Sequence, residues 1–219
     1  HDEEAATVGI AIDISSSMRP MQLDVIETAT ALVQTLVSKK TKVFIVVFDN
    51  TARILHPPSS DVVSLRAKLL DLYAAGGTTL FDGMIFALQQ FQGIDGRKAL
   101  IVISDGRDVA SGESADACTR LAKSSGVPIY AIVPHGGFRT GTRFGNALTG
   151  ITESSGGLFF FAPAKKEQPA IFDFIRDEVR GQYVLSFVSP SPAKPATWRK
   201  LDVSVPGRNV RTIAGYYTP

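Results

Sequence analysis

The sequence has little of several features that would place it in a specialised class. Its 219 residues include one cysteine, Cys118, so no disulfide can form within the chain, although a domain of this size can be secreted without one. No apolar run approaches the roughly 20 residues of a membrane-spanning helix, and the printed residues contain no signal-peptide pattern. The net charge of +2 gives no argument for a nucleic-acid partner. These absences exclude a disulfide-stapled scaffold, a membrane span in this chain and a strongly basic nucleic-acid-binding domain.

The composition is that of an ordinary globular domain, with 44 % apolar and 20 % charged residues. Continuous apolar runs, typical of strands buried on both faces, alternate with segments whose apolar residues recur at helical spacing. The expected strands are 8–14, 42–48, 52–57, 98–104, 127–133 and 158–162, and the expected helices are 19–38, 65–72, 81–88, 113–124, 145–155 and 169–180. This alternation predicts an α/β protein with a doubly wound, mostly parallel sheet and helices on both faces.

The last part of the chain has a different pattern. The stretches QYVLSFV (182–188), WRKLDVSV (198–205) and VRTIAGYY (210–217) alternate between apolar and polar residues, and proline-rich segments join them. We interpret them as an antiparallel β-ribbon. Because three short strands are marginally stable alone, we expect the extension 182–219 to dock on the α/β domain formed by residues 1–181.

Polar side chains gather where the predicted strands end. Asp13, Ser15 and Ser17 follow the first strand, Thr78 lies in the glycine-rich loop before the helix at 81–88, and Asp105 follows the strand at 98–104. In doubly wound sheets, ligands bind beyond the carboxyl ends of the strands. All these side chains offer oxygen, the donor that hard cations such as Mg²⁺ prefer, and none offers the sulfur or imidazole of a soft-metal site. The pattern therefore predicts a divalent-cation site.

The first cluster alone has a simpler interpretation. Serine and aspartate before a helix are most often N-terminal caps, and the stretch DISSS would be assigned to capping if it stood by itself. Thr78 and Asp105, at matching strand ends, shift the interpretation toward a metal site. Thr79 is expected to hydrogen bond within its loop, and Asp82 and Asp108 are expected to act as caps or as groups behind the ligands.

These motifs resemble those of the von Willebrand factor type A domain. DISSS matches the family's D-x-S-x-S motif, Thr78 in GGTTLFDG matches its distant threonine, and Asp105 in ISDGRD matches its distant aspartate. The resemblance implies that Ser15, Ser17 and Thr78 contact the ion directly, that both aspartates act directly or through water, and that a protein partner completes the site with a carboxylate. It implies Mg²⁺ as the cation, with Mn²⁺ or Ca²⁺ as alternatives, and an interaction module that is not an enzyme.

The resemblance extends to a bacterial subfamily of exported proteins related to this family. It is carried by RKALIVISDGRDVAS, SGGLFFF, AIFDFIRDEVRGQYVLSF and the closing GYYTP, so it covers nearly the whole chain. The resemblance, and not the composition, thus implies a secreted or cell-envelope location.

Two other functions remain as alternatives. In the first, the chain is a metal-dependent phosphoesterase in which the loop HGGFRTGTRFG and Arg139 assist, but neither His56 nor His135 has an obvious acid–base partner. In the second, the chain is a structural module with an inert metal site. Cys118 lies on the inward face of its predicted helix and is expected to be a core thiol.

Overall fold

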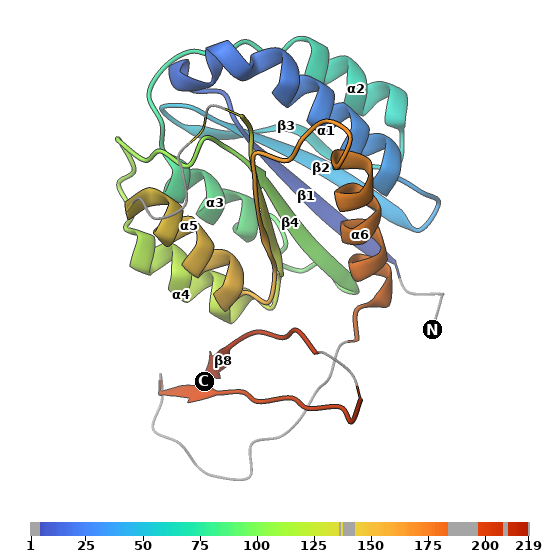
Figure 1. Ribbon diagram of the computed structural model, residues 1–219, viewed down its shortest axis with the longest axis vertical. Helices are drawn as coiled ribbons and strands as arrows, with labels where there is room; N and C mark the ends of the chain where they lie inside the picture. The colour runs from blue at the N-terminus through green and yellow to red at the C-terminus, as the bar shows by residue number, and fades with distance from the viewer. Residues whose placement is uncertain (1–4, 136, 138–142, 184–196, 208–209, 219) are drawn as a thin grey trace.

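The computed structural model describes residues 5–135, 137, 143–183, 197–207 and 210–218. The chain forms one six-stranded sheet, flanked by helices, and a separate two-stranded ribbon (Figure 1). The elements run in the order β1 Ala6–Asp13, η1 Ser16–Met21, α1 Gln22–Leu36, β2 Thr41–Phe48, β3 Ala52–Ser59, α2 Val62–Leu70, α3 Leu80–Gln89, β4 Arg97–Ile103, α4 Ala115–Ser125, β5 Ile129–Val133, α5 Arg143–Ser154, β6 Phe159–Phe161, α6 Gln168–Gly181, β7 Trp198–Lys200 and β8 Gly215–Tyr217.

The strand order in the main sheet is β3-β2-β1-β4-β5-β6. All neighbours are parallel except β2 and β3, which are antiparallel. From the central strand β1, the sheet extends through β2 to β3 on one side, and then through β4 and β5 to β6 on the other. The predicted doubly wound, mostly parallel α/β fold is confirmed, and its topological switch point lies between β1 and β4.

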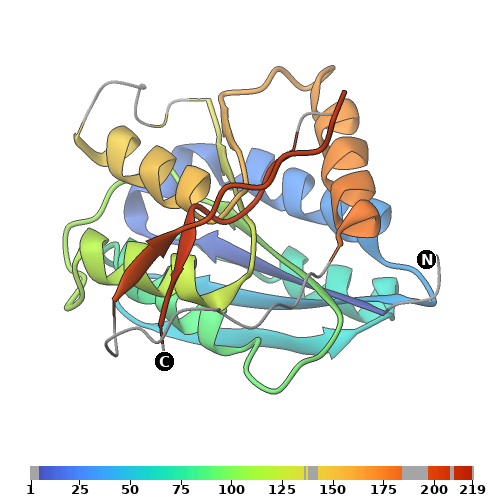
Figure 2. The same cartoon turned by 90° about the horizontal axis from the view of Figure 1, so that it is seen from below.

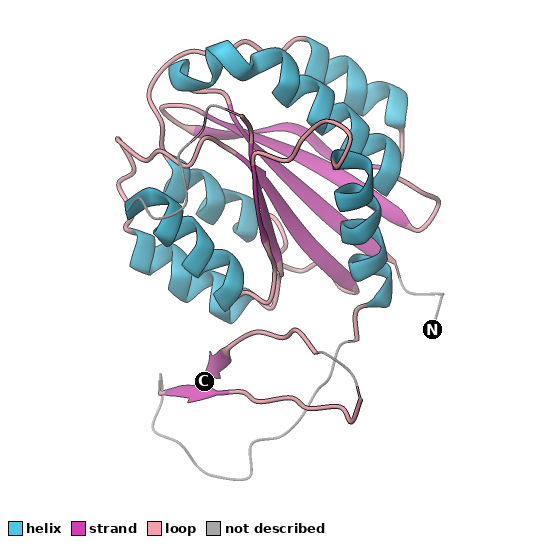
Figure 3. Cartoon of the chain, viewed as in Figure 1, coloured by secondary structure: helices cyan, strands magenta, loops and turns pink. Residues whose placement is uncertain are grey.

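Helices cover both faces of the sheet. One apolar cluster packs α1, α2 and α6 against one face, and a second packs α3, α4 and α5 against the other, as the two layers in Figures 1 and 3 show. The central strands alternate between the two clusters, so Ile10 and Ile12 pack on the first face while Ala11 packs on the second. Gly9 completes this second face because a Cβ there would lie 2.5 Å from the Phe44 ring.

The first predicted helix and the predicted ribbon differ from the structure. The helix expected at 19–38 begins as the 3₁₀ helix η1, which contains Pro20, and becomes α-helical only at Gln22. Proline removes a backbone donor, which a short helix with i→i+3 bonds ahead of α1 tolerates. The ribbon strands predicted at 198–205 and 210–217 shorten to β7 and β8, and Pro206 and Gly207 form a turn in the segment between them. Most of the strand expected at 182–188 falls outside the described residues.

The ribbon and the segment leading to it contact the α/β body. Ala214 N–H donates to Ser154 O at 3.2 Å, and the Lys123 ammonium lies 4.7 Å from the centre of the Trp198 ring. Arg211 pairs with Glu178 of α6. Figure 2, seen from below, shows the segment 210–214, which precedes β8, crossing from α6 toward α4.

Candidate functional site

The predicted site residues lie in three loops at the carboxyl edge of the sheet. Asp13 is the last residue of β1, and Asp105 lies two residues beyond the end of the neighbouring strand β4. A hydrogen bond joins these two strand ends, since Ser104 Oγ donates to Asp13 Oδ2 at 2.7 Å. The third loop carries Thr78 just before α3. The three loops meet at the topological switch point, where ligands of doubly wound sheets bind.

The first loop turns tightly after β1. Ser15 N–H donates to Asp13 Oδ1 at 2.9 Å, and the hydroxyl oxygens of Ser15 and Ser17 lie 3.1 Å apart. Ser15 stands at the N-terminal cap of η1, yet its side chain makes no capping hydrogen bond. The two serine hydroxyls therefore face each other instead of serving the helix end, which departs from the simple capping interpretation of DISSS.

Backbone hydrogen bonds tie the second loop to the other two. Ser16 N–H donates to Gly76 O at 3.0 Å, and the N–H groups of Val109 and Ala110 both donate to Thr78 O at 3.1 Å. Thr78 is 3 % exposed. The adjacent Thr79 acts within its own loop, as expected, because its hydroxyl donates to the Asp49 carbonyl at 2.9 Å.

The third loop holds Asp105 beside a cationic side chain. Arg107 N–H donates to Asp105 Oδ1 at 2.9 Å, and Arg107 Nε lies 3.6 Å from Asp105 Oδ2. The Asp105 side chain is 3 % exposed, whereas that of Arg107 is 49 % exposed. A half-exposed guanidinium thus neighbours a buried carboxylate at this edge.

Burial dominates the electrostatics of Asp13. Removal from water raises the pKa of Asp13 from 3.8 to about 6, hydrogen bonds from Ser15 and Ser104 oppose the rise, and the charge of Asp105 adds to it. Two nearly buried carboxylates near each other destabilise the charged form of Asp13. A bound cation would remove this penalty.

The donor set fits a hard divalent cation. The residues comprise two carboxylates and three hydroxyls, which are Asp13, Ser15, Ser17, Thr78 and Asp105, and hard cations take oxygen ligands. Within the described ranges, no cluster of three or more His, Cys, Asp or Glu side chains could hold a metal. A cation at this edge would therefore depend on the hydroxyls as much as on the carboxylates, and ligation by these five residues stays a prediction.

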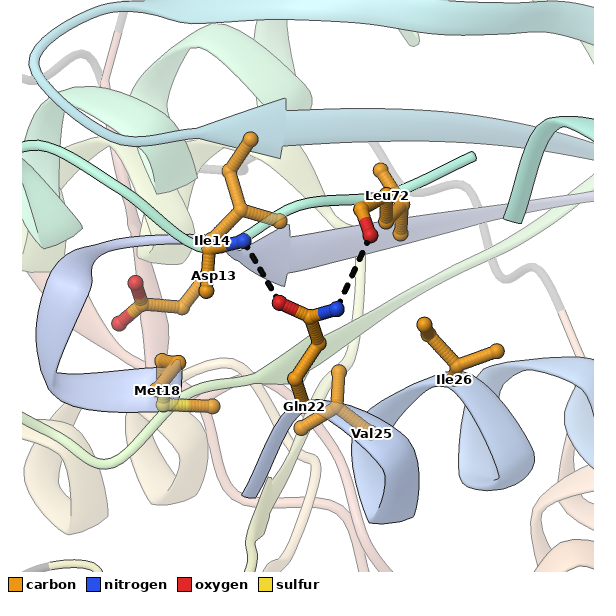
Figure 4. Close-up of a pocket in the computed structure, with 8 residues that line it drawn as sticks. Asp13, Ile14, Met18, Gln22, Val25, Ile26 and Leu72 are labelled. Carbon is orange, nitrogen blue, oxygen red and sulfur yellow. Dashed lines mark hydrogen bonds between the residues drawn. The ribbon is translucent and has the colours of Figure 1, made fainter. Parts of the chain in front are cut away.

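Sequence reasoning missed the residues that fix the loop before Thr78. Gln22 Nε2 donates to Leu72 O at 3.2 Å, and Ala74 N–H donates to Gln22 Oε1 at 2.8 Å, as the dashed lines in Figure 4 show. Asn50 Oδ1 accepts from Gly77 N–H at 2.8 Å. A cavity of about 10 Å³, close to the smallest that admits one water, is lined by Asp13 and Gln22 among others.

Asp82 and Asp108 stand behind the site. Asp108 Oδ1 accepts from Leu80 N–H at 2.9 Å and so caps the start of α3. Asp82 accepts from the N–H groups of Gly112 and Glu113, both at 2.9 Å, which fastens the loop after β4 to the first turn of α3. Both aspartates thus have the structural roles expected of them.

The remaining candidate residues lie apart from this edge or outside the described residues. His56 lies on the edge strand β3, where its ring nitrogens contact Pro57 O at 2.7 Å and Ser64 Oγ at 2.8 Å. Cys118 is fully buried, and burial raises its pKa to about 12, as expected of a core thiol. His135 follows β5 and is exposed, and Arg139 lies outside the described residues.

Comparison with known proteins settles the family. The sequence model of the von Willebrand factor type A domain matches residues 8–173. The chain belongs to the von Willebrand factor type A family. Domains of this family commonly serve protein interactions and adhesion. In the part of the chain that the structure describes, no helix is both long and apolar enough to cross a membrane.

Relatives with this domain come from several bacteria. A UPF0353 protein of Nocardia farcinica is 24 % identical over 211 residues, which cover 80 % of this chain and 63 % of that protein. The chain thus spans less than two thirds of this relative. A von Willebrand factor type A structure from Catenulispora acidiphila has a TM-score of 0.69 at 18 % identity, covering 83 % of this chain and 44 % of that one. The corresponding domain of the type V pili tip protein Mfa5 from Porphyromonas gingivalis has a TM-score of 0.64 at 15 % identity, covering 85 % and 98 %.

Proposed function

We propose that this domain is a protein-binding module that uses a divalent cation to capture a carboxylate of its partner, and that it is not an enzyme. The observation that supports this most strongly is the joining of three loops at one sheet edge. Hydrogen bonds between Ser104 and Asp13, between Ser16 and Gly76, and from the loop after β4 to the Thr78 carbonyl join the loops that carry the five proposed ligands.

The chain's own residues would hold the ion. Ser15, Ser17 and Thr78 would contribute neutral hydroxyls, and Asp13 and Asp105 would contribute negative charge, directly or through water. The bound Mg²⁺ would supply an electrophilic centre that attracts an external anion, because two carboxylates only balance its charge. Mn²⁺ and Ca²⁺ have the same preference for oxygen and are alternatives.

A surface location follows from the same proposal. Solved structures with this fold include the pili tip protein Mfa5 from Porphyromonas gingivalis and an aerotolerance-related membrane protein from Bacteroides fragilis. We place this chain outside the cytoplasm, where a carboxylate-bearing protein would be its ligand.

The metal assignment is tested by calorimetry with Mg²⁺ and Mn²⁺ on the wild type and on Asp13→Ala. We expect Asp13→Ala to lose at least tenfold in affinity, since it removes a buried carboxylate from the set. Asp202→Ala, at an exposed position of the C-terminal segment, is the matched control and should bind as the wild type does. Equal affinities for wild type and Asp13→Ala would refute the assignment.

The carboxylate requirement is tested with an array of peptides that each contain one glutamate, beside matched peptides with glutamine. Binding to the glutamate members should need Mg²⁺ and disappear in EDTA. Thr78→Ala should weaken this binding even where metal remains, because one hydroxyl that would hold the ion is lost while the Thr78 backbone contacts persist. Binding that ignores both EDTA and the glutamate-to-glutamine exchange would favour a structural module with an inert site.

A further inference from the structure

Exposed apolar side chains lie on the loops that carry the proposed metal ligands. Tyr73, in the segment that leads to Thr78, is 64 % exposed, and Val109, in the loop after Asp105, is 71 % exposed. Leu23, in the first turn of α1, is 75 % exposed. A single exposed apolar side chain is ordinary, but several beside one site mark a contact surface.

Backbone hydrogen bonds place Tyr73 and Val109 beside the proposed ligands. Val109 N–H donates to Thr78 O at 3.1 Å, so this valine lies directly against the loop of a proposed ligand. Two residues after Tyr73, Ala75 N–H donates to Ile14 O at 2.7 Å, next to the loop that carries the two serines. A partner that reaches the proposed ion therefore also meets these two apolar side chains.

Tyr73 is held in place on both sides. The Gln22 side chain bonds the backbone of Leu72 and of Ala74, the two neighbours of Tyr73, as Figure 4 shows for its two hydrogen bonds. The Arg19 guanidinium lies 5.5 Å from the centre of the Tyr73 ring, and Arg19 Nε donates to Ala74 O at 3.3 Å. Tyrosine and arginine are enriched among the residues that dominate interface energies, and a ring that is positioned before binding costs little entropy to cover.

The segment from Tyr73 to Thr78 crosses the carboxyl edge of the sheet. Leu72 and Ala74 belong to the apolar cluster under α1, α2 and α6, whereas Leu80, just after this segment, belongs to the cluster on the other face. Five residues of extended chain span at most about 18 Å. A partner segment that lies along this edge can therefore place a carboxylate at the proposed ion and a nearby side chain against Tyr73.

The exposed charge at this edge suits an acidic partner segment. No carboxylate is exposed in the three loop segments, which are 14–20, 73–79 and 106–110. Asp108, in the third segment, is partly buried and caps α3, and Asp71 and Glu113 are exposed just outside these segments. Arg19 is exposed, and its contacts are with a backbone carbonyl and the Tyr73 ring, neither of which carries a charge. An approaching carboxylate thus meets a cation and no exposed acidic side chain within the three loops.

We infer that the partner is a protein segment that carries a large apolar side chain, preferably aromatic, within about five residues of the captured carboxylate. The inference rests on the proposed function, since the ion holds the carboxylate while Tyr73 receives the apolar side chain and Val109 adds a second contact. An aromatic side chain gains from packing on the Tyr73 ring beyond the area that it buries. Tyr73 thus sets which acidic segments bind, and the ion sets that they are acidic.

Fluorescence anisotropy in Mg²⁺ tests the inference with peptides that contain one glutamate among serines. A phenylalanine is placed in turn at each of the five positions on either side of the glutamate. The wild type should bind at least one of these peptides about tenfold more tightly than the peptide without phenylalanine. Tyr73→Ser should abolish this preference and Tyr73→Phe should keep it, while Val109→Ser should reduce it by about two- to threefold. Val63→Ser removes a valine that is 78 % exposed at the start of α2, and should bind as the wild type does.

The outcomes separate this inference from the proposed function. Calorimetry without peptide should give Tyr73→Ser the Mg²⁺ affinity of the wild type, because Tyr73 is not among the proposed ligands. Mg²⁺-dependent binding of the glutamate peptides with no preference for phenylalanine, or a preference that survives in Tyr73→Ser, would overturn the inference and leave the proposed function standing. If no glutamate peptide binds in Mg²⁺, or if binding persists in EDTA, capture by the ion is refuted and the inference falls with it.

Discussion

Replacing Asp13 by asparagine should stabilise the metal-free domain. In the folded chain, burial raises the pKa of Asp13 from 3.8 to about 6, whereas in the unfolded chain the carboxyl regains its ordinary value. The folded state therefore holds a proton between these two pH values and the unfolded state does not. The stability that Asp13 contributes is fully present below pH 3.8 and is lost as the pH rises to about 6.

The size of the effect follows from the two pKa values. One pKa unit corresponds to about 1.4 kcal/mol, so the rise from 3.8 to about 6 corresponds to about 3 kcal/mol of lost stability above pH 6. Asparagine has no charge to bury. Its carbonyl oxygen can accept from Ser15 N–H, and its amide can donate to Ser104 Oγ, so both contacts of Asp13 have a substitute. We expect Asp13→Asn to exceed the wild type by about 3 kcal/mol near pH 7.5 and by about half of that near pH 5.

Urea unfolding in EDTA at these two pH values measures the difference, and Asp202→Asn, at an exposed position, should unfold as the wild type does. Added Mg²⁺ should stabilise the wild type by about 2.7 kcal/mol at one hundred times its dissociation constant, and should leave Asp13→Asn nearly unchanged. An Asp13→Asn protein no more stable than the wild type in EDTA, or a difference that does not vary with pH, would refute this reasoning.

Three further predictions concern residues around the site and the fold. Ser104→Ala leaves an oxygen of Asp13 without its donor in a buried place, and should lower the free energy of unfolding by about 1–3 kcal/mol in urea titrations. Gly157→Ala would place a Cβ 1.9 Å from the carbonyl oxygen of Ile129 in β5, and should destabilise the fold by about 3 kcal/mol or prevent folding. The control Gly150→Ala, whose Cβ meets nothing within 4 Å, should not destabilise the fold, and equal stabilities of the two variants would contradict the expected clash. Arg107→Gln removes a cation that would compete with Mg²⁺ for Asp105, and should raise the Mg²⁺ affinity by about two- to fivefold in calorimetry. A lower affinity in this variant would contradict the prediction and would mean that the Arg107 side chain supports the site.

The sequence predicts the main sheet well because its central strands are buried on both faces. Such strands are continuous apolar runs, and β1, β2 and β4 were each expected within two residues of their observed bounds. The start of the first long helix was predicted less well, because apolar spacing continues through Pro20 while the hydrogen-bond pattern changes there. The ribbon strands were predicted too long, since alternation alone does not show where a ladder ends.

The candidate site, like the fold, could be predicted from the sequence only in part. Topology and resemblance predicted that the clusters at Asp13, Thr78 and Asp105 would meet, and the structure brings their loops to one edge. The side chains that fix these loops could not be predicted, because each acts through a contact distant in sequence. Gln22 hydrogen bonds to the backbone of residues 72 and 74, and Ser104 hydrogen bonds to Asp13 on the neighbouring strand. Neither side chain belongs to a local sequence motif that would predict this role.

The α/β body begins and ends at the same edge. Ala5 enters beside Arg97, and Gln182 leaves beside Lys98, and both of these partners lie at the start of β4. Flanking residues therefore attach on one side of the body, and the candidate metal site faces the other way at the full length of the central strands. An attachment through these flanking residues would hold the domain by its base and present the opposite tip, so a pull on it would load the attached side and would leave the loops at the tip outside the line of force.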